Sequence, residues 1–193
     1  MYSLLPAVVS LLFLCCGGYV LQSRGVSRIS LTFFLLCATT FCWQFTWAVM
    51  FQVEDAKVAE AAAKLGYLII LFLPTTLYHF IAELTVQRRR ERSWVELSYV
   101  VAGMLGLILL SSDWIIAGVQ RYFFGFYPKA GPLHVLHLLQ TGAVVGRGLW
   151  LLYQRQKLAV STEKTRRIKL HAVIAQVIDR GEAVDEQADQ AIA

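Results

Sequence analysis

The chain has 193 residues, of which 57% are hydrophobic and 16% charged, and its net charge is +5. Most of the basic excess flanks long apolar segments, where it acts as a topological signal next to anionic lipid headgroups. The basic C-terminal stretch has no interleaved aromatic residues and no nucleic-acid-binding motif, so length, composition and charge exclude a nucleic-acid partner.

Five apolar segments account for most of the chain: residues 3–21, 29–50, 65–86, 94–111 and 132–153. Each is close to the ~20 residues that a helix rising ~1.5 Å per residue needs to cross ~30 Å of hydrocarbon. Helices are expected there because the bilayer core offers the backbone no water. The predicted fold class is therefore all-α: a polytopic bundle of five transmembrane helices in contact with the lipid bilayer.

The basic residues between these segments alternate in abundance along the chain. The first and third connections and the C-terminal tail carry 13 of the 18 Lys and Arg residues, whereas the second and fourth connections carry four. Under the positive-inside rule this distribution predicts an N-terminus outside the cell and a C-terminus in the cytoplasm. We therefore expect a multi-pass protein of a bacterial inner membrane.

Two predicted outer connections have unusual compositions. Residues 54–64 are rich in helix formers and have no Pro or Gly before Gly66, so they should extend a neighbouring helix. The segment Asp113–Pro132 is too aromatic for an ordinary solvated loop. It predicts an ordered lid over the outer mouth of the bundle, with turns at Gly125 and Gly131-Pro132. An aromatic belt in contact with lipid is the alternative.

The composition changes after the fifth apolar segment, which predicts one domain over residues 1–154 and a cytoplasmic region over residues 155–193. This region begins with a basic linker. Residues Ile168–Ile178 then repeat apolar side chains at helical spacing but are too few to span the bilayer, which favours a short amphipathic helix. The acidic, Ala-rich residues after Ile178 have no packing signal and are expected to be disordered.

Ionisable side chains at membrane depth are costly and therefore mark candidate functional positions. Pro74 should kink the third helix, and His79 and Glu83, four residues apart, share one of its faces. Counting inward from the basic flanks places Arg147 of the fifth helix at the depth of Glu83. We predict a polar network of His79, Glu83 and Arg147, with separate snorkelling of Glu83 and Arg147 to the headgroups as the alternative.

A second group of polar and aromatic residues lies at the predicted outer depth. On the second and fifth helices it comprises Trp43, Gln44, Trp47, His137 and Thr141, and the aromatic segment adds Trp114, Tyr122 and Tyr127. These residues predict a pocket for a small amphiphilic ligand, and ordinary helix packing is the alternative. His134 and His137 lack a third ligand, so no metal site is predicted, and no cofactor is expected.

Two stretches carry a family resemblance: Leu73-Pro-Thr-Thr-Leu-Tyr-His-Phe, and Gly125-Phe-Tyr-Pro-Lys-Ala-Gly-Pro-Leu at the start of the fifth helix. With the tryptophan-bearing second helix, residues 1–167 resemble the seven-helix membrane sensor region at the N-terminus of bacterial histidine kinases. The resemblance implies an input module that passes a membrane or periplasmic signal to cytoplasmic output domains. The sequence departs from it because no sixth or seventh span, phosphoacceptor helix or ATP-binding domain follows.

Kinase activity is therefore not carried over, and the sequence holds no phosphate-binding glycine loop, GxSxG or HExxH motif. We predict a non-catalytic sensor module of a two-component system, with a protein partner on the cytoplasmic side or within the membrane. The alternative is an accessory or scaffolding subunit of a larger inner-membrane complex.

Overall fold

The structure is a computed structural model that describes residues 2–85 and 87–192, without the side chains of Arg88 and of residues 164–192. In chain order the elements are α1 (Leu4–Arg24), α2 (Arg28–Met50), α3 (Ala56–Ile70), α4 (Leu73–Leu84), α5 (Arg88–Ser111), β1 (Ile116–Tyr122), β2 (Gly125–Ala130) and α6 (His134–Ile192). Five helical stretches of the described chain are long and apolar enough to cross a membrane, which confirms the predicted spans: Leu4–Arg24, Arg28–Met50, Ala56–Leu84, Arg89–Ser111 and His134–Glu163.

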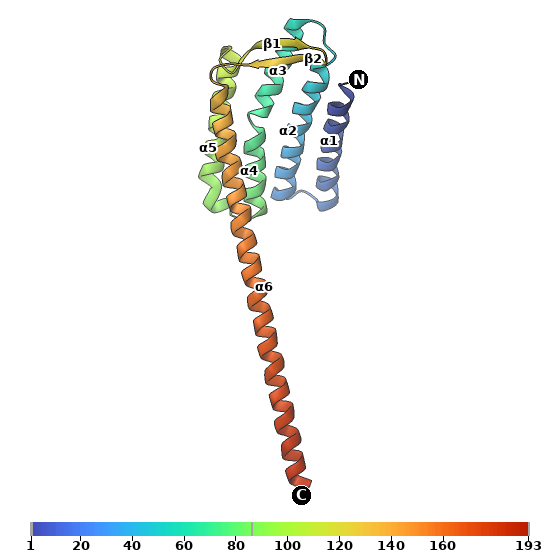
Figure 1. Cartoon of the computed structure of the whole chain (residues 1–193), viewed down its shortest axis with the longest axis vertical. Helices are drawn as coiled ribbons and strands as arrows, with labels where there is room; N and C mark the ends of the chain where they lie inside the picture. Colours follow the sequence, from blue (N-terminus) through green and yellow to red (C-terminus); the bar gives the residue numbers. More distant parts are fainter. Residues whose placement is uncertain (1, 86, 193) are drawn as a thin grey trace. The chain divides into compact units, whose positions relative to one another are not determined.

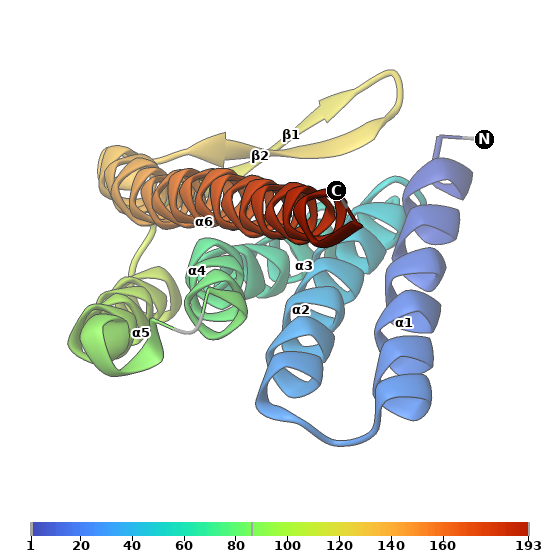
Figure 2. The ribbon, with the colours of Figure 1, turned by 90° about the horizontal axis from the view of Figure 1, so that it is seen from below.

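The chain divides into two compact units, Met1–Leu151 and Leu152–Ala193, and α6 runs through both. In the first unit α1, α2, the α3/α4 pair and α5 stand in a row, with the β1–β2 hairpin across one end (Figures 1 and 2). We call this the hairpin end. The opposite end, which we call the arginine end, holds the α1–α2 and α4–α5 connections with Arg24, Arg28 and residues 89–92.

The α1–α2 turn is defined by short-range hydrogen bonds and by one glycine. Gly25 has a φ of 70°, which favours glycine, and Ser27 and Ser30 form a reciprocal capping box at the start of α2. Farther along α1, a Cβ added to Gly17 would lie 2.8 Å from the Cys37 Cβ, so the two helices approach closely there. The cysteines of the described residues are free: Cys37 is buried at this contact, Cys42 is half-buried, and Cys15 and Cys16 are exposed.

The third membrane span is interrupted. Residues before Gly66 extend it as predicted, since α3 starts at Ala56 with Asp55 as its N-cap, accepting from the Lys57 amide at 2.7 Å. The helix then ends at Ile70, and α4 starts at Leu73 with Pro74 in its first turn. Pro74 has no N–H to continue the ladder, so the break lies just before it, in agreement with the predicted kink.

The aromatic segment adds two strands to the predicted all-α architecture. β1 and β2 pair antiparallel with Tyr122 opposite Gly125, so the turn consists of Phe123 and Phe124. The chain before and within the hairpin is anchored by Ile115, Ile116 and Phe126, which are buried in a cluster with α2, α3 and α5 residues, among them Met50, Leu105 and Leu109. The aromatic segment thus packs on the ends of the helices as an ordered structure, which is the packing that the lid prediction expects.

Residues 134–192 form one helix, α6, without an interruption at the predicted domain boundary of 154. The predicted amphipathic helix over Ile168–Ile178 and the acidic tail after it depend on side chains that lie outside the described part of the chain. The predicted division of residues 155–193 into linker, amphipathic helix and disordered tail therefore stays a prediction.

Candidate functional site

An ion pair with a fully buried carboxylate joins α5 to α6 near the arginine end. Arg147 donates from Nε to Glu91 Oε2 at 3.0 Å and from Nη2 to Glu91 Oε1 at 2.8 Å, which is a bidentate pair. The Glu91 side chain has no exposed surface, whereas the Arg147 side chain is 35% exposed. A carboxylate without exposed surface depends on such a partner, because removing the partner would leave a buried charge uncompensated.

Tyr78 of α4 completes this cluster by donating its hydroxyl proton to Glu91 Oε2 at 2.6 Å. The helices come close enough for these bonds because Gly148 packs on α4, where an added Cβ would lie 3.0 Å from Ile81 Cδ1. Glu91 also lies in the first turn of α5, where the helix dipole favours a negative charge. The Tyr78–Glu91–Arg147 cluster therefore ties three helices together at one level.

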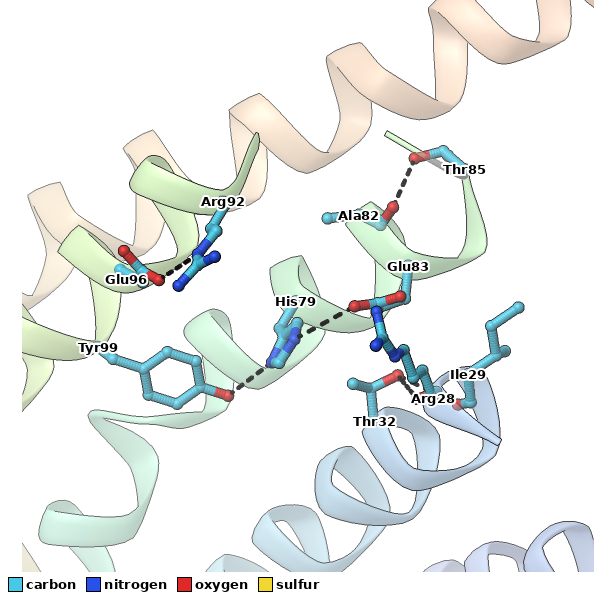
Figure 3. Close-up of polar contacts among 10 residues, drawn as sticks. All are labelled: Arg28, Ile29, Thr32, His79, Ala82, Glu83, Thr85, Arg92, Glu96 and Tyr99. Atoms are coloured by element: carbon cyan, nitrogen blue, oxygen red, sulfur yellow. Dashed lines mark hydrogen bonds and ion pairs between the residues drawn. The ribbon is translucent and has the colours of Figure 1, made fainter. Parts of the chain in front are cut away.

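The predicted network of His79, Glu83 and Arg147 does not form as one unit, since the acidic partner of Arg147 is Glu91. Figure 3 shows His79 between two other groups, with its Nδ1 3.2 Å from the Tyr99 hydroxyl and its Nε2 3.9 Å from Glu83 Oε1. His79 and Glu83 do share a face, as their spacing predicted. The pairing of Glu83 with Arg147 is wrong.

The reason is rotational. Tyr78, which lies at the level of Arg147, and Glu83 are five residues apart and therefore point about 140° apart around α4. His79 and Glu83, four residues apart, differ by only about 40° and turn together toward Tyr99 of α5. Counting residues from the basic flanks predicts how deep Arg147 lies in the membrane. It does not predict which side of α4 faces Arg147.

Beside the cluster, a cavity of about 600 Å³ lies between α5 and the first turns of α6. Arg147, Tyr78 and Trp94 line it near the arginine end and Gln140 lines it farther along α6, with apolar side chains between them. None of the residues predicted for the outer ligand pocket lines this cavity.

At the hairpin end the structure brings some of those predicted residues together. Trp47 of α2 packs on Tyr127 of β2 with ring centroids 5.1 Å apart, and Tyr127 meets Tyr122 edge to face at 6.1 Å. Trp43 and Gln44 are half-buried on α2 and make no ring or side-chain hydrogen-bond contact with this group in the described chain. Trp114 is 60% exposed, and its carbonyl accepts from the Leu133 amide at 2.8 Å.

The remaining predicted residues, His137 and Thr141, lie on a buried polar face of α6. His137 Nδ1 and Thr141 Oγ1 are buried without a hydrogen-bond partner, as are His134 Nδ1 and Gln140 Oε1 on the same side of the helix. The Gln140 amide nitrogen does reach the Leu71 carbonyl at 3.4 Å, in the break between α3 and α4. Within the described residues no group of three His, Cys, Asp or Glu side chains could hold a metal ion.

Sequence reasoning missed Glu91 and Tyr78. Glu91 stands among the arginines of residues 88–92, in the basic third connection that predicts a cytoplasmic flank, and Tyr78 lies in the Leu73–Phe80 stretch that carries the family resemblance. One signal was available: Glu91 is the single acidic residue in that run, at the start of a helix, and thus a natural partner for an isolated arginine at similar depth.

In a comparison with protein families, residues 5–178 match a family described as the N-terminal seven-transmembrane region of histidine kinases. The chain belongs to this family. The resemblance found in the Leu73–Phe80 and Gly125–Leu133 stretches is thereby confirmed. Comparisons with curated proteins and with solved structures give no match.

Membership in the histidine kinase seven-transmembrane family defines the chain as a membrane sensor input region. It is a multi-pass protein of the bacterial inner membrane, with helices in contact with lipid. The family is described by seven transmembrane segments, and the described part of this chain has five helical stretches that meet the length and hydropathy of a span.

Proposed function

We propose that this chain is a non-catalytic input module that registers a signal at the hairpin end and relays it along α6 to a cytoplasmic protein partner. The observation that carries the proposal is the direct junction between the hairpin and α6. The Gly131 amide donates to the Ile115 carbonyl at 2.9 Å, and the Leu133 amide donates to the Trp114 carbonyl at 2.8 Å. The residues that lead into the hairpin thus also fix the start of α6.

Two contacts would couple a change at the hairpin to the rest of the bundle. Phe51 at the end of α2 packs edge to face on Phe124, with ring centroids 5.6 Å apart, so the hairpin turn rests on α2. Farther along, the Tyr78–Glu91–Arg147 cluster holds α6 to α4 and α5. An effector must bind two states of the hairpin with different affinities for this scheme to transmit a signal.

Displacing the hairpin should change the distance between the arginine end and the later part of α6. Spin labels at Gln22→Cys and Thr162→Cys, in the full chain with its four native cysteines replaced by alanine, would report this distance in lipid nanodiscs. We expect Gly125→Ala, which pushes the hairpin off Phe51, to shift the measured distance distribution.

The matched control is Gly118→Ala. Gly118 lies in the same hairpin with a φ of 102°, but an added Cβ would meet nothing within 4 Å. It should leave the label distance unchanged. Equal distance distributions in both variants and the parent would contradict the relay through α6.

We also propose that the hairpin end faces the outside of the cell, because the arginine-rich connections lie at the opposite end. A single cysteine at Lys129 should react with a membrane-impermeant maleimide on intact spheroplasts, whereas a single cysteine at Arg89 should react only after permeabilisation. Reaction of both sites in intact spheroplasts would refute this orientation.

A further inference from the structure

The cavity between α5 and α6 has the form of a chain-binding groove that opens at the surface of the bundle. Its middle is apolar, lined by Leu97, Val101, Leu136, Leu139 and Ala143. Several lining side chains are largely exposed, among them Leu139 at 65% and Trp94 at 57%. In a bilayer, such a groove admits a hydrocarbon chain from the surrounding lipid.

The end of the groove near Arg147 is cationic. Glu91 carries one negative charge and is flanked by two guanidinium groups, Arg147 at 2.8 Å and Arg90 at 3.9 Å. The three groups together leave one positive charge. Arg90 has a 68% exposed side chain, and Trp94, one turn along α5, lines the groove at the same end.

Arg147 retains hydrogen-bonding capacity toward an additional acceptor. A guanidinium has five N–H donors in a fixed planar arrangement, and the bonds to Glu91 use the Nε donor and one on Nη2. Because Glu91 fixes the plane of the group, the exposed edge is preorganised for an oxyanion, and arginine binds phosphate oxygens in this manner.

We propose that this groove is a binding site for an anionic phospholipid, with one acyl chain along Leu139 and Ala143 and the phosphate at Arg147 and Arg90. Basic pockets between transmembrane helices are a known setting for such headgroups. A zwitterionic lipid could fill the same apolar groove, but its headgroup would leave the positive charge of this end uncompensated. The site shares Arg147 with the cluster that holds α6 to α4 and α5, but lipid binding there does not require that the proposed relay operates.

The test compares phosphatidylglycerol with phosphatidylcholine of the same acyl chains, added to the full chain in a neutral detergent. Phosphatidylglycerol should raise the melting temperature in a saturable way, since a ligand that binds the folded state stabilises it. Phosphatidylcholine should not. Arg90→Gln should weaken phosphatidylglycerol binding about fivefold, the loss expected for one arginine near a charged headgroup.

Filling the groove provides a second, steric test. Ala143→Phe places a ring in the groove and should abolish the phosphatidylglycerol shift. Gly142→Phe adds the same ring on the adjacent residue, which does not line the groove and has nothing within 4 Å of its Cβ position, and should keep the shift.

Three results would overturn the proposal: equal shifts with both lipids, equal shifts in Ala143→Phe and Gly142→Phe, or a change of oligomeric state in Ala143→Phe alone. The last would mean that a second copy of the chain occupies the groove. Failure of the lipid test would leave the hairpin relay untouched, because the distance measurement compares hairpin variants in identical nanodiscs and alters no residue of the groove.

Discussion

Replacing Arg147 with methionine should lower the free energy of unfolding by about 3–5 kcal/mol, the usual cost of removing one partner from a buried ion pair. Glu91 would keep its position with no exposed surface and lose both charge-assisted hydrogen bonds. Methionine retains most of the aliphatic length, so packing changes little. Unfolding from mixed micelles by increasing amounts of dodecyl sulfate would measure the loss.

The double variant Glu91→Gln/Arg147→Met should recover part of this loss, because it removes both charges. A matched control is Arg92→Met. Arg92 donates from Nε to Glu96 at 2.7 Å, on the same helix as Glu91, but both side chains are largely exposed, so its loss should change stability little. Equal effects of Arg147→Met and Arg92→Met would show that the Arg147–Glu91 pair stabilises the bundle no more than an exposed ion pair does.

The spans could be predicted from sequence because the length of an apolar run is a one-dimensional property. The bilayer sets that length and excludes non-helical backbone, so the five runs and the five helical spans coincide. The break before Pro74 was predictable for a similarly local reason, the missing backbone donor.

The partner of Arg147 could not be predicted because it depends on the rotation of three helices about their axes. Depth along the chain pointed to Glu83 and does not by itself distinguish it from Glu91. Gly148 packs closely on Ile81 of α4, and Arg147 beside it faces the side of α4 that carries Tyr78 and thereby Glu91. Such contacts are long-range in sequence and leave no periodic signal.

The hairpin was predicted as an ordered aromatic segment but not as two strands. Its residues lack the strict alternation of a half-buried strand, since the register shifts between Ile116 and Val119 and three aromatic residues follow one another at 122–124. Pairing is favoured instead by burial of Ile116 and Phe126 against the helix ends. This burial is a tertiary effect.

Gly125→Ala should have the second large effect, loss of hairpin docking. Gly125 has a φ of 130°, where any other residue is strained, at a cost of about 1–3 kcal/mol. In addition, a Cβ at this position would lie 2.8 Å from the Phe51 Cα, a backbone atom that cannot rotate away. The hairpin must therefore move relative to α2, which separates Tyr127 from Trp47.

Trypsin cleavage after Arg121 and Lys129, both in the hairpin, would report this movement as faster proteolysis of the folded protein. Gly118→Ala separates the two causes, because a φ of 102° imposes a similar strain while the added Cβ meets nothing within 4 Å. Gly125→Ala should lower the free energy of unfolding by about 1–3 kcal/mol more than Gly118→Ala does, which is the cost of overpacking. If both variants were cleaved equally fast, backbone strain alone would account for the effect, and the contact with Phe51 would not hold the hairpin on α2.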